Sequence, residues 1–284
     1  MTADLHSTHV SATGATEHTK ASGNAALAQA ATALPPITLE EMDGVKLLNR
    51  IDTKYVTNEA TLLQLLSDAQ AAGYRALETA GSKISRYHTV YYDTDNLQMF
   101  LDHHNKRLVR QKVRTRVYVN SGDTYLEIKR KNNHGRTKKK RTSIPESELM
   151  DFSLDAAATG YLSRHSAFTA EQLSPALSTG FSRITLVNSA MTERLTIDTG
   201  LSFENHRTGH KATLHDAVII ELKQDGRAAS QMKNILLERR VKPLRISKYC
   251  IGTTLTNQEV KHNRFKEKVR AIEKIINRQI TQYD

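Results

Sequence analysis

The fold of this chain is decided by the stretch RQKVRTRVYVNSGDTYLEIKRK, residues 110–131. Its first half places basic residues on every second position, at Arg110, Lys112, Arg114 and Arg116. Valines fill the other parity, at Val113, Val117 and Val119. A β-strand directs alternate side chains to opposite faces, so one face of this strand is apolar and the other is a row of cations. Because adjacent cations repel, such a row favours folding only if an anion lies against it, and phosphate is the expected anion.

The second half of the stretch predicts a hairpin partner for this strand. Residues 120–123 have the composition of a turn, and the next strand follows at residues 125–131. Glu127, Lys129 and Lys131 share one face of it, opposite Leu126 and Ile128. A second turn at residues 132–135 leads into a third basic strand, residues 136–144. The sequence therefore predicts neighbouring strands that carry cations on one face.

The composition describes a basic protein with an ordinary apolar core. The chain has 284 residues and a formal net charge of +11. No apolar run approaches the ~20 residues that a membrane helix needs, and the start of the chain lacks the pattern of a secretory signal. The one cysteine, Cys250, fits a reducing compartment, and no Cys/His cluster has zinc spacing. We therefore expect a cytoplasmic protein.

The chain divides into a tail and one domain. Residues 1–36 are rich in Ala, Thr, Ser, Gly and His without apolar periodicity, which predicts a disordered N-terminal tail. Residues 37–284 are expected to form a single domain ending in a C-terminal helix. Helices are expected at residues 58–72, 95–104, 228–240 and 259–281, and further strands at 50–56, 83–93, 181–188, 193–198, 201–205 and 217–223. Many antiparallel strands with interspersed helices predict an α+β fold with a closed or nearly closed sheet.

The later strands repeat the alternation of the first. Polar or charged side chains share a face at Arg183 and Thr185, at Arg194, Thr196 and Asp198, and at Glu221 and Lys223. A solvated sheet surface would explain this pattern, but such a surface mixes both signs of charge freely. Here the charges are mostly Arg and Lys, with single carboxylates at Glu127, Asp198 and Glu221. This favours a barrel whose charged face lines a lumen and whose apolar face packs outward against helices.

A cationic lumen has a clear chemical use. Arg and Lys bind phosphate oxygens through charge-assisted hydrogen bonds, each worth about 1.5–3 kcal/mol. The isolated carboxylates would hold Mg²⁺ or Mn²⁺, which bridge phosphates and leave few ligands for the protein to supply. Phosphoryl transfer needs little more than aligned, neutralised phosphates, and no general base is required if the nucleophile is itself a phosphate oxygen.

An ordered series of short motifs extends this pattern along the chain. The motifs are Lys54-Tyr55-Val56, Tyr91-Tyr92-Asp93-Thr94, Arg114-Thr115-Arg116, Glu127 to Lys131, Lys139-Lys140-Arg141, Arg183, Arg194 to Asp198, Glu221-Leu222-Lys223 and Ser247-Lys248-Tyr249. As a set they resemble the VTC domain of the polyphosphate polymerases, in the triphosphate tunnel metalloenzyme (CYTH-like) superfamily. The resemblance covers residues 39–255. It implies an eight-stranded antiparallel β-tunnel, a closed barrel with a charged lumen and flanking helices.

The resemblance also implies roles for individual residues. Those that resemble the catalytic, phosphate-binding residues of the tunnel are Arg114, Arg116, Lys129, Arg183 and Arg194, and those expected to bind phosphate or nucleotide are Lys54, Lys140, Lys248, Glu127 and Lys223. Glu221 resembles the metal-binding glutamate, for Mn²⁺ or Mg²⁺. In the run of residues 138–141 parity leaves the inward side chain open between Lys139 and Lys140, and Lys140 is favoured. Arg110 and Lys112 are expected at the tunnel mouth or on a solvated edge.

The resemblance implies a polyphosphate polymerase that moves the terminal phosphoryl group of ATP onto a polyphosphate chain. An inositol phosphate as regulator and a membrane protein as partner are further expectations. Arg50 stands where the related CYTH enzymes have the first glutamate of a Glu-x-Glu-x-Lys motif, which weakens the case for two-metal hydrolysis. The alternatives are a triphosphate or nucleoside triphosphate hydrolase and a non-catalytic sensor of polyphosphate or inositol phosphate. A nucleic-acid binder is disfavoured, because the basic strands lack interleaved aromatic residues for base stacking.

Overall fold

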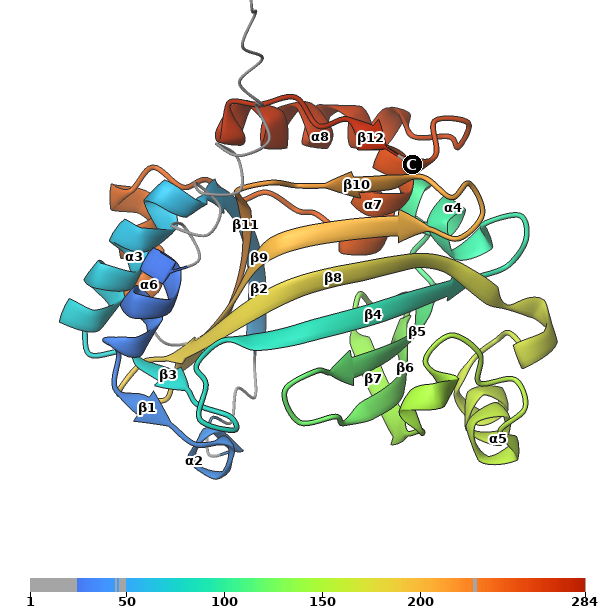
Figure 1. Ribbon diagram of the computed structural model, residues 1–284, viewed down its shortest axis with the longest axis horizontal. Helices are drawn as coiled ribbons and strands as arrows, with labels where there is room; N and C mark the ends of the chain where they lie inside the picture. Colours follow the sequence, from blue (N-terminus) through green and yellow to red (C-terminus); the bar gives the residue numbers. More distant parts are fainter. Residues whose placement is uncertain (1–24, 44, 46–49, 227–228, 284) are drawn as a thin grey trace, which may run out of the picture.

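The computed structural model describes residues 25–43, 45, 50–226 and 229–283, whose strands form one strongly curled sheet (Figure 1). Eight strands make the wall of the curl in the order β2-β11-β9-β8-β4-β5-β6-β7, and each pair of neighbours is antiparallel. Their bounds are β2 Arg50–Asn58, β4 Ser85–Asp93, β5 Arg110–Tyr118, β6 Thr124–Lys131, β7 Thr137–Ser143, β8 Ser174–Val187, β9 Glu193–Asn205 and β11 Ala217–Asp225. The prediction of an α+β fold with an antiparallel sheet is confirmed.

Short strands and helices complete the fold. The short strands, which extend the sheet at its margins, are β1 Pro36–Ile37, β3 Arg75–Leu77, β10 Lys211–Thr213 and β12 Gln282–Tyr283. The helices are α2 Leu39–Asp43, α3 Glu59–Ala71, α4 Gln98–His104, α5 Ala156–His165, α6 Gln231–Glu238, α7 Lys248–Thr256 and α8 Asn263–Ile276, with single 3₁₀ turns at Glu146–Glu148 and Ala170–Gln172. None of the helices in the described part of the chain has the length and apolar character needed to span a membrane.

The two predicted turns and the first long helix form as the sequence indicates. The turns between β5 and β6 and between β6 and β7 contain Gly122 and Gly135, with φ of 74° and 80°, a conformation that costs glycine least. The Asn58 side chain caps α3 by accepting a hydrogen bond from the backbone N–H of Thr61 at 2.9 Å. The chain then leaves α3 at Gly73, with φ of 76°.

One predicted pair of strands is a single long strand. Residues 193–198 and 201–205 were expected as two strands, but β9 runs through both and changes neighbour along its length. Its first half pairs with β11, from Glu193 to Asp198, and its second half pairs with β10. Gly200, with φ of 60°, lies where the partner changes. Because β9 pairs with different strands along its two halves, the sheet can bend sharply there.

The sheet is curled but open, which corrects the expectation of a closed barrel. Among the described residues β2 is paired only with β11 and β7 only with β6, so no hydrogen bonds join the two ends of the wall. The free edge of β2 is covered instead by the segment that precedes α7. There Tyr55 and Pro243 form an isolated bridge, and the N–H of Leu244 donates to the carbonyl of Lys54 at 2.8 Å. In the described part of the chain, β7 therefore has no partner on its outer side.

Helices cover the convex face of the sheet, as the outward apolar parity predicts. The apolar sides of β8, β9 and β11 pack against α3 and α6, in a core cluster that includes Leu66, Ile197 and Ile220. The other end of the convex face, formed by β5 and β6, packs through Leu126 and Ile128 against a cluster that includes Leu162 of α5. This arrangement leaves the charged parity on the concave side.

Part of the predicted N-terminal tail is folded. Residues 1–24 lie outside the described residues, but residues 25–32 form a helix. Leu27, Ala31 and Leu34 are buried in the same core cluster as α3. These three residues follow the i, i+4, i+7 spacing of one helix face. The Ala-rich composition hides this spacing, so part of the segment assigned to the tail belongs to the fold.

One end of the concave side is filled by α7 and α8. Tyr249, Cys250 and Ile251 of α7 are buried against side chains from the concave face, among them Tyr91 and Ile219. Asp93, fully buried at the end of β4, ties this end together by accepting hydrogen bonds from the N–H groups of Met99 and Phe100 and from the Tyr249 hydroxyl. The helices thus form a floor at one end of the curl and leave the rest of its inside open.

Candidate functional site

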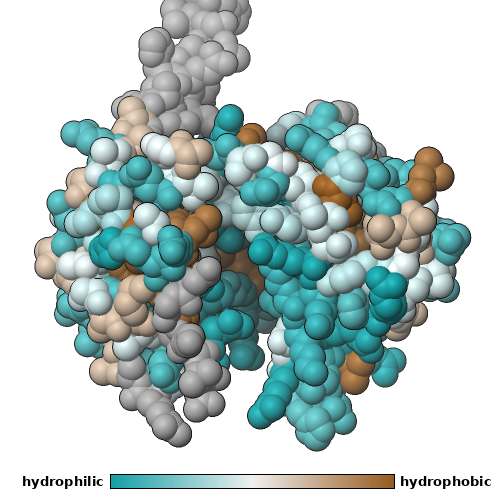
Figure 2. Space-filling model, turned by 90° about the horizontal axis from the view of Figure 1, so that it is seen from below, coloured by the Kyte–Doolittle hydropathy of each residue, from teal (hydrophilic) through white to brown (hydrophobic). Residues whose placement is uncertain are grey.

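The inside of the curl is a cavity of about 810 Å³, which we call the trough. Figure 2 shows it as a deep hollow between two lobes of the molecule, with hydrophilic side chains along much of its visible lining. Of the described residues that line it, fifteen are Lys or Arg and five are Asp or Glu. This excess of positive charge gives the trough a field that attracts anions.

The alternation that opens the sequence is reproduced on β5. Arg110, Lys112, Arg114 and Arg116 all line the trough. Val113 and Val117 lie on the other face and are buried. The same parity holds on β6, β8, β9 and β11, whose charged residues converge on one cavity although they are spread along the sequence from Arg110 on β5 to Lys223 on β11. A solvated outer surface is therefore not the explanation for this row of cations.

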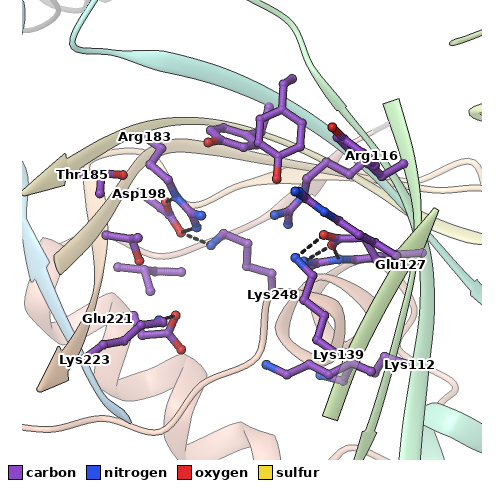
Figure 3. A pocket seen from close by; sticks show the side chains of 18 of the residues that line it. Lys112, Arg116, Glu127, Lys139, Arg183, Thr185, Asp198, Glu221, Lys223 and Lys248 are labelled. Atoms are coloured by element: carbon purple, nitrogen blue, oxygen red, sulfur yellow. Dashed lines mark hydrogen bonds and ion pairs between the residues drawn. The ribbon is translucent and has the colours of Figure 1, made fainter. Parts of the chain in front are cut away.

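Glu127 of β6 is the centre of the first ion-pair cluster in the trough. Its carboxylate accepts hydrogen bonds from Arg114 Nε at 2.7 Å and Nη2 at 2.5 Å, and it also pairs with the Lys139 ammonium (Figure 3). The Glu127 side chain is only 2% exposed. Burial raises the pKa of this carboxyl, but Arg114, Arg116 and Lys139 outweigh that effect and hold the pKa well below its usual range. Glu127 thus fixes two cations in place.

Asp198 of β9 is the centre of the second cluster. Arg183, its cross-strand neighbour on β8, donates from Nε and Nη2 to the two carboxylate oxygens at 2.6 and 2.8 Å. The Lys248 ammonium, at the start of α7, pairs with the same carboxylate. Despite burial, these two cations hold the pKa of Asp198 well below its usual range. The cluster ties the floor helix to the wall.

Glu221 of β11 is the centre of the third cluster. It lies directly across from Lys54 of β2 in the register, and the Lys54 Nζ is 2.5 Å from Glu221 Oε1. Lys223, two residues further along β11, pairs with the other oxygen. Burial lowers the pKa of Lys223 to about 8, although Glu221 acts to raise it. Lys54 and Lys223 together hold the pKa of Glu221 well below its usual range.

Three further cations have no carboxylate partner among the described residues. Arg116, 5% exposed, donates from Nε to the Thr89 hydroxyl at 2.9 Å and forms no ion pair. The Nε of Arg194 is buried without a hydrogen-bond partner. The Lys129 ammonium has no ion-paired carboxylate among the described residues. Burial lowers the pKa of all three groups. At these positions the described residues supply no ion-paired carboxylate.

An aromatic pair supports several of these cations. The rings of Tyr87 and Phe181 stack with centroids 5.2 Å apart and planes 2° from parallel. The guanidinium carbons of Arg183 and Arg116 lie 5.1 and 5.4 Å from the Tyr87 centroid. The Lys248 ammonium lies 4.3 Å from the Phe181 centroid. Cation–π attraction therefore holds together three charges that would otherwise repel.

The start of α7 presents polar groups to the trough. The Ser247 hydroxyl caps the helix by accepting from the N–H of Cys250 at 3.4 Å. It also accepts from the Lys112 ammonium at 2.6 Å. Lys112, expected near a tunnel mouth or a solvated edge, is thus bound to a residue inside the trough. The positive end of the helix dipole adds to the field of these cations.

Tyr91 of β4 is a buried phenol among four cations. Its ring stacks on Tyr249 with centroids 5.2 Å apart, and its hydroxyl accepts from Arg114 Nη1 at 3.4 Å. Burial raises its pKa, but Arg114, Arg116 and other nearby cations outweigh this and lower the pKa to about 8. Tyr91 thus joins the aromatic floor to the Glu127 cluster.

The structure brings together all but one of the site residues predicted from the sequence. Those that line the trough are Lys54, Arg114, Arg116, Glu127, Lys129, Arg183, Arg194, Glu221, Lys223 and Lys248. The exception is Lys140, whose choice as the inward residue of its strand is wrong. Lys140 pairs with Ile128 in the register and lies on the outer face, whereas Lys139 pairs with Lys129 and points inward to Glu127. Every residue from 138 to 141 is basic, so no apolar position marks the buried face.

Sequence reasoning gave no role to several residues that shape the trough. Tyr87 and Phe181 form its aromatic support, and Ser247 joins the trough to α7. Parity could have identified Tyr87, since it shares the inward parity of Tyr91 on β4. Phe181 likewise shares the parity of Arg183 on β8.

A divalent metal would depend on substrate oxygens at this site. The described residues contain no group of three His, Cys, Asp or Glu side chains placed to hold a metal ion. Glu221, the predicted ligand, is surrounded by cations and offers a single carboxylate. Mg²⁺ and Mn²⁺ bound to phosphates take one or two protein carboxylates and complete their shell with phosphate oxygens and water. The donor set therefore fits a metal that arrives with a phosphate ligand.

Comparisons with known proteins give the family of the chain. The family model described as VTC domain matches residues 49–257, and the search of curated proteins gives no match. Among solved structures, a Bacillus halodurans protein provisionally assigned as an adenylate cyclase is 14% identical with a TM-score of 0.46, over 70% of this chain and 96% of its own. A Hippeastrum protein, provisionally assigned as an adenylyl cyclase and described as having a dominant triphosphatase activity, is 15% identical with a TM-score of 0.47, over 75% of this chain and 100% of its own. Because the family match spans most of the chain, in agreement with the ordered motifs, the protein belongs to the VTC domain family.

Proposed function

We propose that the protein is a phosphotransferase that moves the terminal phosphoryl group of ATP onto a polyphosphate chain. The observation that carries this proposal is a set of cations that line the trough without an ion-paired carboxylate among the described residues: the buried Arg116, the half-buried Arg194 and the more exposed Lys129. They come from three different strands and face one cavity. A bound chain of phosphates would supply the negative charge that these side chains lack.

The chemistry needs few groups beyond these cations. The bond between the β–γ bridging oxygen and the terminal phosphorus of ATP breaks, and a terminal oxygen of the polyphosphate forms the new bond as ADP leaves. Both the nucleophile and the leaving group are phosphate oxygens, so no general base is required. Cations fixed by Glu127 and Asp198 offer preorganised positive charge along the path of the transferred group.

Glu221 is the proposed holder of the metal. Bound there with the phosphates, Mn²⁺ or Mg²⁺ would bridge phosphate oxygens and neutralise their charge. Lys54 and Lys223 now occupy both oxygens of this carboxylate, and both could turn to the phosphate when the metal takes their place. Glu221→Gln should therefore weaken the response to metal more than it weakens tripolyphosphate binding without metal.

A second candidate is a non-catalytic sensor of polyphosphate or inositol phosphate. The observation that favours it is that Asp52, Glu127, Asp198 and Glu221 are each already ion-paired with a cation. A site built only to bind an anion would need no free carboxylate. Such a protein would bind tripolyphosphate or an inositol phosphate tightly and show no turnover of ATP.

The test is to incubate the purified protein with ATP and Mn²⁺ or Mg²⁺, with and without a short polyphosphate primer. We expect a ladder of polymer on a gel and a matching release of ADP. Release of orthophosphate without polymer would identify a hydrolase. Binding without any product would identify the sensor. Arg116→Ala should remove the ladder, and Lys266→Gln, on an exposed face of α8, is the control of equal charge change outside the trough.

A further inference from the structure

The strand β7 carries cations on both of its faces. Lys139 and Arg141 line the trough, whereas Lys138 and Lys140 lie on the opposite face. All four of these residues are exposed. Lys138 stands directly across from Arg130 of β6 in the register, so the outer face has its own row of positive charge, which we call the outer row: Arg130, Lys138 and Lys140.

The outer row lacks negative partners. Within the described chain no carboxylate lies within ion-pair distance of Arg130, Lys138 or Lys140, and the contact found for Arg130 is to a backbone carbonyl at 3.5 Å. Like charges directly opposite each other on two strands destabilise a sheet. By contrast, inward Lys139 is neutralised by Glu127. The outer row therefore repeats, on the surface, the shortage of negative charge seen inside the trough.

The edge of β7 connects the two faces. β7 pairs with β6 on one side and with no other strand in the part of the chain that the structure describes. Its residues are exposed along nearly its whole length, and Figure 1 shows the strand at the rim of the curled sheet. No strand among these residues pairs with this edge, so a chain of phosphates that fills the trough can pass over it. It would then move from Lys139 and Arg141 directly onto the outer row.

We propose that the outer row is a second binding surface for polyphosphate, which holds the part of a long chain that has left the trough over the edge of β7. This inference rests on the proposed function, since it assumes a polyphosphate bound inside. The proposal predicts different affinities for short and long phosphate chains. A short phosphate oligomer reaches only the trough, whereas a long chain reaches both surfaces and is bound more tightly.

The test compares two probes on one variant, Lys138→Gln/Lys140→Gln. Tripolyphosphate and a long linear polyphosphate are titrated into the full chain, and their dissociation constants are measured over a range of salt concentrations. We expect the variant to bind the long chain at least about threefold more weakly, because two surface charge contacts are lost. Its affinity for the long chain should also depend less steeply on salt concentration. Its affinity for tripolyphosphate should equal that of the unmodified protein.

A matched control removes the same charge elsewhere. Lys266 and Lys274 are exposed on α8, which lies on the opposite side of the molecule from β7 in Figure 1. Lys266→Gln/Lys274→Gln should leave both affinities unchanged. Lys139→Gln, on the inner face, should weaken both probes.

Three results would overturn the outer row as a polyphosphate surface. The first is an unchanged affinity of Lys138→Gln/Lys140→Gln for the long chain, and the second is an equal loss of that affinity in the α8 control. The third comes from titrating single-stranded RNA as an additional probe: it is a larger loss of affinity for RNA than for polyphosphate in Lys138→Gln/Lys140→Gln. Failure of the unmodified protein to bind tripolyphosphate would instead overturn the proposed function.

Discussion

Arg114 and Arg116 are neighbours on one face of β5, yet they have opposite effects on the folded state. Arg114 is bonded to Glu127, a buried carboxylate, through two of its nitrogens. Arg116 has no ion-paired carboxylate among the described residues. Burial lowers the pKa of Arg116, and the nearby charge of Arg114 lowers it further. The first arginine therefore stabilises its surroundings, whereas the second is held in place against electrostatic repulsion.

Alanine substitutions should separate these two roles. Arg114→Ala leaves Glu127 with Lys139 alone, so we expect a loss of about 3 kcal/mol in the free energy of unfolding. Arg116→Ala removes a repulsive charge, so we expect a change within about 1 kcal/mol. Both should weaken tripolyphosphate binding about tenfold or more, the effect of a lost charge-assisted hydrogen bond. Urea unfolding and calorimetry measure the two quantities, and equal losses of stability would contradict this assignment.

The pH dependence of binding should come from Lys223 and Tyr91, whose pKa values both lie at about 8. As the pH rises through 8, Lys223 loses its positive charge and Tyr91 gains a negative one. Tripolyphosphate affinity should therefore fall between pH 7 and 9. Calorimetry across this range checks the fall, and Lys223→Arg and Tyr91→Phe should each remove part of it. An equally steep fall in the double variant would show that other groups are responsible.

The stability of the free protein should respond to pH in the opposite sense. Both pKa values are lower in the folded state than the usual values of 10.5 for lysine and 10.0 for tyrosine. Above pH 8 the unfolded chain therefore binds more protons than the folded one at these two positions, and their contribution to stability rises with pH up to about 10.

At the scale of single elements, α7 shows why one part of the site could not be read from the sequence. Its residues Lys248–Thr256 are buried nearly all round, so no apolar stripe marks a helix. The motif around Lys248 was recognised, but not the helix that positions it. The orientation of β7 was uncertain for a related reason: with four consecutive basic residues, parity has no apolar partner to follow. Where polar and apolar residues alternate, as on β5 and β11, the inward side was predicted correctly.

The cap of α7 should link stability to binding. Ser247→Ala removes the cap and the acceptor for Lys112, so we expect a loss of about 1 kcal/mol in unfolding free energy and weaker tripolyphosphate binding. Asp155→Ala is a suitable control, because Asp155 caps α5 outside the trough by accepting from the N–H of Ala157 at 2.7 Å. It should cost similar stability and leave binding unchanged. Chemical unfolding and calorimetry on both variants measure the contrast, and unaltered binding in Ser247→Ala would contradict it.

At the scale of the whole molecule, we expect an anion bound in the trough to stabilise the folded state, because it would neutralise cations that repel one another. We expect tripolyphosphate at one hundred times its dissociation constant to raise the free energy of unfolding by about 2.7 kcal/mol. For a chain of this size that corresponds to a rise in Tm of about 5–10 °C. Thermal unfolding with and without the ligand measures it. Arg116→Ala should show a smaller rise, and an equal rise with chloride at the same ionic strength would contradict specific binding.

The sequence predicts the wall of the sheet better than its closure. The alternation of side chains requires only local information, so the faces of β5, β6, β8, β9 and β11 follow from it. Whether the ends of the wall meet depends on what covers their edges, and residues 243–244, which cover β2, are an irregular segment with no strand pattern. The barrel was therefore expected to close where the structure is open.

The bridge between Tyr55 and Pro243 has a topological consequence. A closed tube admits a polymer only by threading one of its free ends. Since the sheet is open between β2 and β7 in the described part of the chain, the polyphosphate of the proposed function could enter sideways and be bound at an internal segment, even when both of its ends are blocked or joined into a ring. Binding and release would then not require the polymer to slide through the site along its full length. The rate constants of binding and release should therefore not depend on polymer length.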